Sequence, residues 1–467
     1  MLPMFLGVVD QTIVATALPS IGQEFGSVER LSWIMVSYLV ALTISAPVFG
    51  VLGDSFGRRR LLLVSLGLVA VFSLGCAAAT SVEMLVAGRF LQGLGGGGLL
   101  TLSHALIGES VPPRQRGHYQ SYTASVAVTA STFGPVIGGL LAEHFGWQSV
   151  FLINLPIAAA AAILVWRLPT SHAPQEDFRF DYAGVLLFSL FVSSTLIALE
   201  QLQDPSRLSL PLFSTLIGVA AILLPALIWR ERRASLPLLP LSLLSSPAIW
   251  RSDTLAFLHG ACMLALITFV PIYLCVVHAV SASQAGLIML PMTASIGLGS
   301  ITTGRLVSKT GRTAIFPSIG MCIATLSLLH FAWRSPDMST MAASINLGVS
   351  AFFMGSVMAV VQITVQWAAG PHRLGRAAAS VQLSRSLGAA FGTALVGTLI
   401  FLMINLGESD AARMLSDILG RDPRTLAMVT PAIRHDIATA FRAGFLLVGG
   451  FAGVAAVLAW TLPLRRV

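Results

Sequence analysis

Two ionisable residues stand inside apolar runs that are long enough to cross a bilayer. Asp10 lies near the middle of the first run, and Arg89 lies in the fourth. An ionised carboxylate at the bilayer centre costs about 2.5–3.5 kcal/mol, so such a residue is a candidate functional site. Loss of hydration favours the protonated form of a carboxyl group, as a reversible proton carrier requires. We predict an ion pair between Asp10 and Arg89 that proton binding weakens, the alternative being a structural aspartate tied to a neighbouring serine or backbone group.

The elements that must position this pair are membrane-spanning helices. A run of about 20 apolar residues crosses a bilayer as an α-helix. The chain has 467 residues, of which 55% are hydrophobic and 10% are charged, against ~25% charged in ordinary soluble domains. The sequence therefore predicts an all-α polytopic membrane protein with fourteen spans, at about 3–21, 31–50, 61–80, 84–107, 120–142, 148–167, 182–200, 210–229, 253–275, 284–304, 313–333, 338–365, 376–404 and 440–463.

The loop charges predict an orientation. Most of the arginines and the single lysine fall in alternate turns, and turns rich in Lys and Arg stay in the cytoplasm. We expect a multi-pass protein of the bacterial cytoplasmic (inner) membrane with both termini in the cytoplasm. The net charge of +8 is then a property of loops and gives no reason to expect a nucleic acid partner. The first run carries Asp10 and lacks a basic leader, so no cleavable signal peptide is expected.

The cysteines and histidines predict no metal site and no cofactor. The four cysteines lie within or beside apolar runs, without CxxC spacing and without clustered histidines. They read as small apolar residues of helices, namely Cys76, Cys262, Cys275 and Cys322.

A polar turn joins the second and third runs. It reads Gly50-Val51-Leu52-Gly53-Asp54-Ser55-Phe56-Gly57-Arg58-Arg59-Arg60. A plain orientation turn explains the arginines but not the spacing of the glycines and the aspartate. Asp54 is expected to cap a helix end and to pair with an arginine, either Arg58 or one in the turn at 109–119. Such pairs would hold the cytoplasmic face closed, so we assign a cytoplasmic gate to Gly50, Asp54, Gly57 and Arg58.

A weaker copy of this turn, Gly304-Arg305-Leu306-Val307-Ser308-Lys309-Thr310-Gly311-Arg312, follows the tenth run without the aspartate. An internal repeat indicates two related halves. The turn and its copy resemble those of the major facilitator superfamily, whose plan of two six-helix bundles implies one bundle at 1–170, an inserted transmembrane hairpin with linkers at 171–235, and a second bundle at 236–467. The segment 405–439 of the last unit is expected to form an amphipathic element on the outer face.

Two further motifs are rich in glycine. Arg89-Phe90-Leu91-Gln92-Gly93-Leu94-Gly95-Gly96-Gly97-Gly98 lies in the fourth run. No strand precedes it and no Gly-Lys-Ser/Thr follows, so a phosphate-binding loop is excluded. Gly134-Pro135-Val136-Ile137-Gly138-Gly139 lies in the fifth run, where the proline and the glycines predict a kink with close helix packing. Any packed membrane bundle uses glycine and proline, so this second motif alone is a weak signal. Close helix packing through Gly95 to Gly98 also explains the first motif and is compatible with a functional role of Arg89.

Together these motifs resemble the major facilitator superfamily. The polar turn is similar to its Gly-x-Leu-x-Asp-x-x-Gly-Arg-Arg signature. Asp10-Gln11-Thr12-Ile13-Val14-Ala15-Thr16-Ala17-Leu18-Pro19 is similar to the first-helix motif of the fourteen-helix drug:proton antiporters. The resemblance implies proton coupling through Asp10 and Arg89, and an antiporter motif at Gly134, Pro135, Gly138 and Gly139. Trp147-Gln148-Ser149-Val150-Phe151-Leu152-Ile153-Asn154-Leu155-Pro156 is similar to a further stretch of that family.

Other polar residues are weaker candidates. We expect a substrate cavity lined by Asp10, Tyr38, Gln92, Gln362 and Arg385, although hydrogen bonding between helices explains Gln362 equally well. Asp253 and His259 lie at the start of the ninth run, where contact with the membrane interface is a sufficient explanation.

The sequence favours a proton-coupled exporter that works by alternating access as a monomer. An apolar cavity with one carboxylate suits amphipathic compounds, including those with a single positive charge. The alternative is a transporter, exporting or importing, of one metabolite, because a fold does not determine its cargo. An enzyme is not expected, since the chain shows no paired catalytic carboxylates, no metal-spaced histidines and no nucleophile elbow.

Overall fold

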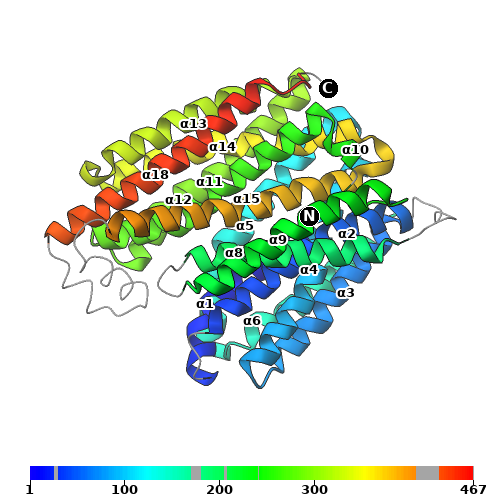
Figure 1. Ribbon diagram of the computed structural model, residues 1–467, viewed down its shortest axis with the longest axis horizontal. Coiled ribbons are helices and arrows are strands. Elements are labelled where there is room, and N and C mark those ends of the chain that lie inside the picture. The colour runs from blue at the N-terminus through cyan, green and yellow to red at the C-terminus, as the bar shows by residue number, and fades with distance from the viewer. Residues whose placement is uncertain (26–29, 170–179, 204–207, 240, 406–430, 466–467) are drawn as a thin grey trace.

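The computed structural model describes residues 1–467 except 26–29, 170–179, 204–207, 240, 406–430 and 466–467 (Figure 1). Within these described residues the chain is helical and contains no β-strand. Fourteen of its helical segments are long and apolar enough to cross a membrane, as predicted.

The first half packs six spans around two hydrophobic clusters. The sixth span is broken at Ile153, so the single run predicted at 148–167 forms two helices. The elements are α1 (Leu2–Phe25), α2 (Leu31–Phe56), α3 (Arg58–Ala77), α4 (Val82–Ser110), α5 (Pro113–Phe145), α6 (Ser149–Leu152) and α7 (Asn154–Trp166).

The second half packs around one larger cluster with an aromatic centre, in which Tyr273 contacts Phe331, Phe441 and Phe445. The elements are α11 (Pro247–Val277), α12 (Ala282–Thr310), α13 (Ile315–Arg334), the short η3 (Ser335–Asp337), α14 (Thr340–Ala369), the short η4 (Pro371–Arg373), α15 (Leu374–Asn405) and α18 (Pro431–Trp460). Of the outer segment predicted at 405–439, residues 406–430 lie outside the described part, and Pro431 begins α18.

Between the halves run α8 (Tyr182–Gln203) and α9 (Leu210–Arg233), followed by the short α10 (Leu241–Leu244). Figure 1 shows this hairpin across the line where the halves meet. The side chains of Phe188 and Val192 on α8 pack in one cluster with Val40 of α2 and Leu383 of α15. The hairpin therefore covers the seam between α2 and α15.

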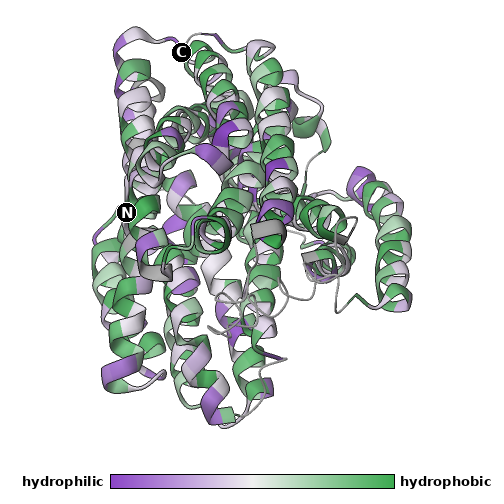
Figure 2. Cartoon of the chain, turned by 90° about the vertical axis from the view of Figure 1, so that its left-hand side faces the viewer, coloured by the Kyte–Doolittle hydropathy of each residue, from purple (hydrophilic) through white to green (hydrophobic). Residues whose placement is uncertain are grey.

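Local sequence explains where several helices begin. The hydroxyl of Ser81 accepts a hydrogen bond from the Met84 amide at the start of α4. Ser281 and Gln284 form a capping box at the start of α12. Figure 2 shows hydrophobic residues along the helices, with hydrophilic residues gathered at helix ends and at isolated positions within them.

The two halves meet at the end of the molecule that carries Asp54, which we call the motif face. Figure 1 shows the two sets of helices converging toward this end, on the right, and diverging toward the left. A Cβ atom on Gly50 would lie 2.8 Å from the Gly375 carbonyl oxygen, and one on Gly117 would lie 2.9 Å from that of Gly304. Glycine at these positions lets α2 contact α15 and α5 contact α12, backbone against backbone.

Candidate functional site

The predicted ion pair between α1 and α4 is present. Arg89 Nη1 donates to Asp10 Oδ2 at 2.8 Å, and neither residue has any solvent exposure. Arg89 lies about 10 Å along the axis from the first residue of α4. This end of α4 is opposite to the motif face, so the pair lies away from the contact between the halves.

Further side chains of α4, α7 and α3 complete the site around Asp10. Gln92 Nε2 and Asn154 Nδ2 both donate to Asp10 Oδ1, at 2.9 Å and 2.7 Å. The same two amide groups donate to the hydroxyl of Ser73 on α3. The Asp10 carboxylate thus accepts three hydrogen bonds from side chains of two other helices, α4 and α7.

The aromatic ring of Tyr38 on α2 lies against the guanidinium group of Arg89. The guanidinium carbon of Arg89 lies 4.0 Å from the centre of the Tyr38 ring, and the Tyr38 side chain is buried. A buried cation over an aromatic face gains electrostatic stabilisation. Tyr38 therefore packs against Arg89 inside the protein and does not face an open surface.

The glycines of α4 make this arrangement possible. A Cβ atom on Gly93 would lie 2.6 Å from the Tyr38 carbonyl oxygen, and one on Gly96 would collide with the Tyr38 hydroxyl. Gly97 and Gly98 meet Ser45 of α2 and Ser65 of α3 in the same way. The glycine run lets α4 lie against α2 and α3 closely enough for Arg89 and Gln92 to reach α1.

The predicted antiporter motif packs on the helix that carries Asp10. A Cβ atom on Gly138 would lie 2.6 Å from the Ile13 carbonyl oxygen, and one on Gly134 would collide with the Thr12 hydroxyl. Pro135 lies between them inside α5, whereas Gly139 faces open space. α5 therefore lies in close contact with α1 within one turn after Asp10.

A second charged group lies at the motif face. Arg58 Nη2 donates to Asp54 Oδ1 at 2.6 Å, and Arg58 Nη1 donates to Glu109 Oε2 at 2.5 Å. Asp54 also accepts from the backbone amides of Gly375 at 2.8 Å and Arg376 at 3.1 Å. Asp54 therefore caps α15 of the opposite half, a partner that the sequence motif did not indicate. The predicted pairing with Arg58 is present, and Gly57 with φ +92° forms the turn.

The weaker copy of the turn occupies the matching place in the second half. Gly304 contacts Gly117 as Gly50 contacts Gly375, and Ser308 stands where the first copy has Asp54. The Ser308 hydroxyl is buried and has no hydrogen-bond partner in the described part of the chain. Both contacted glycines follow a proline by four residues, in Pro113–Gly117 and Pro371–Gly375, a repeat we did not recognise in the sequence. Among the described side chains, the charged contact is thus present between α2 and α15 but not between α5 and α12.

The residues expected to line a substrate cavity divide into two groups. Asp10, Tyr38 and Gln92 belong to the buried ion-pair site described above and are closed to solvent. Gln362 is 2% exposed on α14, while Arg385 on α15 is partly exposed. Asp253 and His259 are both buried, so the expectation of interfacial side chains was wrong for them.

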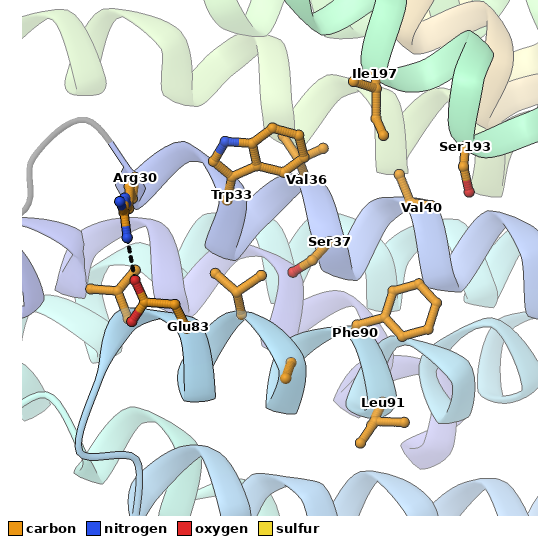
Figure 3. Close-up of a pocket in the computed structure, with 13 residues that line it drawn as sticks. Arg30, Trp33, Val36, Ser37, Val40, Glu83, Phe90, Leu91, Ser193 and Ile197 are labelled. Atoms are coloured by element: carbon orange, nitrogen blue, oxygen red, sulfur yellow. Dashed lines mark hydrogen bonds and ion pairs between the residues drawn. The ribbon is translucent and has the colours of Figure 1, made fainter. Parts of the chain in front are cut away.

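A separate groove of about 640 Å³ lies between α2, α4 and α8 (Figure 3). Its lining is apolar apart from a few residues, and Arg30 pairs with Glu83 at one end. Trp33 and Ser37 of α2 line the groove. The Ile34 carbonyl oxygen and the Tyr38 ring, which contact Arg89, lie on an adjacent face of the same helix. The groove is therefore separate from the ion-pair site.

The residues that sequence reasoning missed in the ion-pair site are Ser73 and Asn154. Asn154 belongs to the stretch noted at 147–156, where Trp147, Phe151 and Asn154 recur at helical spacing. Trp147 donates to Glu24 of α1, and Phe151 lies 5.9 Å from the Arg89 guanidinium. That spacing was the signal that these three side chains face one common region. No cluster of His, Cys, Asp and Glu suited to a metal occurs in the part of the chain that the structure describes.

The model of the Major Facilitator Superfamily matches residues 1–393. The chain belongs to this superfamily. The fourteen spans and the similarity to multidrug transporters agree with its fourteen-helix drug:proton antiporter family.

Several known proteins are similar to this member of the superfamily. The multidrug transporter protein MdtP of Bacillus subtilis is 31% identical over 85% of this chain and 73% of its own length. Multidrug resistance protein fnx1 of Schizosaccharomyces pombe is 28% identical over 96% of this chain and 89% of its own. An MFS-type transporter of Mycobacterium tuberculosis is 36% identical over 85% of this chain, which spans only 58% of that relative.

Solved structures show the same fold at low identity. The human organic anion transporter MFSD10 superposes with a TM-score of 0.64 at 16% identity, covering 98% of each chain. The proton:xylose symporter XylE superposes with a TM-score of 0.62 at 15% identity, covering 100% of this chain and 95% of its own.

Proposed function

We propose that this protein exports amphipathic compounds across the bacterial cytoplasmic membrane in exchange for protons. The observation that carries the proposal is the Asp10 carboxylate, buried and bound by Arg89, Gln92 and Asn154 within the bilayer-spanning helices. The multidrug transporters named above support export of amphipathic cargo.

In the coupling step, a proton replaces the Arg89 guanidinium as the positive charge that neutralises the Asp10 carboxylate. A proton on Asp10 removes the negative charge that Arg89 faces, so the ion pair weakens while Arg89 keeps its contacts with Tyr38 and Gln92. Protonation then favours an arrangement in which α1 separates from α4, a shift of population between two conformations. Because α5 packs on α1 through Gly134 and Gly138, the shift reaches the interface between the halves.

Alternating access follows from the motif face. We place this face and both termini in the cytoplasm, and we treat 1–170 and 236–467 as the moving bodies with 171–235 between them. The contact of Asp54 with Gly375 then closes the cytoplasmic side in the present conformation. Protons bind Asp10 from the outer side, the contact opens, and the proton leaves toward the cytoplasm.

Asp10 is unavailable to a cationic cargo in this conformation. Its carboxylate is buried and neutralised by Arg89, which removes the reason for expecting positively charged substrates. The proposed cargo is therefore defined here by its amphipathic character alone.

The test is dye transport in inverted membrane vesicles under an imposed pH gradient, using ethidium and a panel of neutral and anionic dyes. Transport by the wild type should collapse with a protonophore and fall at least tenfold in Asp10→Asn. Glu83→Gln is the matched control, because Glu83 is an exposed acid that pairs with Arg30 at the outer end of α4. Transport that survives in Asp10→Asn would remove the coupling site. Absence of dye transport by correctly inserted wild type would favour a carrier of one metabolite.

A further inference from the structure

Arg385 is a cation within the span region whose charge is not balanced. It lies about 16 Å along the axis of α15 from Leu374, near mid-depth for a helix that crosses ~30 Å of hydrocarbon. Its backbone packs on Gly260 of α11. Its guanidinium makes one hydrogen bond, from Nη2 to Gln382 Oε1 at 2.9 Å, and no ion pair with any described residue. Cations at this depth normally pair with an acid.

Buried polar side chains of both halves lie on the helices that pack against α15 near this cation. His259 of α11 precedes Gly260, on which the Arg385 backbone packs, and His104 of α4 precedes Ala105, which packs with Ala378 of α15 two turns before Arg385. Gln366 of α14 donates to the His104 carbonyl oxygen at 3.0 Å, and Gln362 lies one turn away on the same helix face. We call this group the Arg385 cluster; it contains Arg385, His104, Gln120, His259, Gln362 and Gln382.

Several polar atoms of the cluster have no partner among the described residues. His104 Nδ1 donates to Gln120 Oε1 at 2.9 Å, which leaves the Nε2 group of Gln120 without an acceptor. His259 Nδ1 and Gln362 Oε1 are unpaired as well. Gln120, His259 and Gln362 are each at most 5% exposed. Buried polar groups are normally hydrogen-bonded, so unpaired groups beside a partly exposed cation point to a ligand that enters among them.

No carboxylate of the described spans compensates the cluster. Asp10 is committed to Arg89, Gln92 and Asn154. Asp253 accepts from the hydroxyl of Ser380 at 3.3 Å. Asp253 therefore contacts α15 at Ser380, five residues before Arg385. Five residues correspond to about 140° around a helix axis, so Asp253 and the Arg385 side chain lie on different sides of α15. Among the described residues the cluster therefore carries one positive charge, the free amide donor of Gln120, the unpaired ring nitrogen of His259 and the free acceptor of Gln362.

We propose that the Arg385 cluster binds a negatively charged group of the cargo, so that the transported compounds are amphipathic organic anions. This inference rests on the proposed function, because it names the substrate class of the same transporter. The guanidinium suits a planar carboxylate or a sulfonate. The ring pair of Phe257 and Phe391, with centres 5.5 Å apart on α11 and α15, offers an apolar surface near the same level.

Exchange of an organic anion for a proton moves net charge across the membrane. Export of a monoanion in exchange for an inward proton moves two positive charges inward per cycle, whereas export of a monocation moves none. Transport of the anion should therefore respond to membrane potential at constant pH.

The test uses one apolar body with three end groups, namely naphthylbutyl sulfonate, naphthylbutanol and naphthylbutyl trimethylammonium. Proton release from acidified inverted vesicles is recorded after each compound is added. In the wild type the sulfonate should reach half-saturation at a concentration at least tenfold below that of the alcohol. Arg385→Gln should remove this preference while changing the value for the alcohol less than threefold, and Arg385→Lys should restore part of it. Arg334→Gln, which removes an exposed arginine of α13, should behave as the wild type.

Binding of the three compounds to the purified proteins separates this inference from the proposed function. Asp10→Asn should bind the sulfonate as the wild type does while moving no protons. If the wild type binds the sulfonate through Arg385 without proton movement, proton exchange fails and the anion site stands. A preference for the trimethylammonium compound, an unchanged sulfonate preference in Arg385→Gln, or no sulfonate binding by folded wild type would overturn the anion site.

Discussion

Asp54 accepts a hydrogen bond from the backbone amide of Gly375, a residue 321 positions later in the chain. The contact joins the end of α2 to the start of α15 and thus one half of the transporter to the other. The same carboxylate holds Arg58, which in turn holds Glu109 at the end of α4. One side chain therefore links three helix ends at the motif face.

Asp54→Asn should weaken closure of the motif face. Asp54 and Arg58 are 2% and 4% exposed, and loss of one partner from a buried ion pair costs about 3–5 kcal/mol. The closed conformation should lose most of that stabilisation, so the population shifts toward the open one and transport falls. Spin-label distances across α2 and α15 would report the shift. Unchanged distances in the variant would show that Asp54 does not hold the face closed.

Gly375→Ala should separate the same two helices without altering charge. A Cβ atom there would lie 2.8 Å from Asp54 Oδ1 and would collide with the Gly50 carbonyl oxygen. We expect crosslinking between cysteines placed on α2 and α15 to decrease and transport to fall more than tenfold. Gly67→Ala is the control, because Gly67 on α3 has no atom within 4 Å of the added position. Equal activity of the two variants would contradict the close contact.

Tyr38 provides a prediction about Arg89. Tyr38→Phe keeps the aromatic face that lies 4.0 Å from the guanidinium, whereas Tyr38→Leu removes it. A desolvated cation–π contact is worth about 2 kcal/mol. Thermal unfolding in detergent should therefore show a clear loss of stability for Tyr38→Leu and little change for Tyr38→Phe. The same order is expected for transport. If both variants lose equal stability, the hydroxyl and not the ring supports the site.

Asp181 provides a prediction about pH. Burial raises the pKa of Asp181, but hydrogen bonds from Arg230 and from the Gly184 amide outweigh burial and lower the pKa below the ordinary 3.8. A lowered pKa means that the contact adds stability above the unfolded pKa and loses it as pH falls through the folded pKa. The melting temperature of the wild type should thus fall more steeply below about pH 4 than that of Asp181→Asn. Parallel curves for the two proteins would contradict the pairing.

The sequence predicted the contacts that depend on one helix face or one turn. The pair of Asp10 and Arg89 follows from the cost of lone charges in a bilayer, and the pair of Asp54 and Arg58 follows from a spacing of one helical turn. The sequence did not reveal that Gly375 would meet Asp54, or that Ser73 and Asn154 would join Asp10. Such contacts depend on how separate helices rotate and slide against each other, which a single helix pattern does not specify. The correct prediction of fourteen spans needed only length and composition.

The charge expected for the cargo illustrates the same limit. A carboxylate in the first span suggested positively charged compounds, although its predicted pairing with Arg89 already neutralises it. The sequence did not show that Arg385 would lack an acid partner among the described residues. A sequence gives the charged residues of each span but does not show which charges remain unpaired, because pairing depends on the distances between side chains in the folded protein.

The position of α8 makes the two sides of the transporter unequal toward the surrounding lipid. α8 packs on both α2 and α15, so acyl chains are kept from that junction between the halves. In the described part of the chain, α8 and α9 do not pack on the junction of α5 and α12, and most of the membrane-spanning part of α5 is not buried. A hydrophobic compound dissolved in the bilayer therefore meets a shielded flank and an unshielded flank, and lateral exchange with the lipid is expected along α5 and α12.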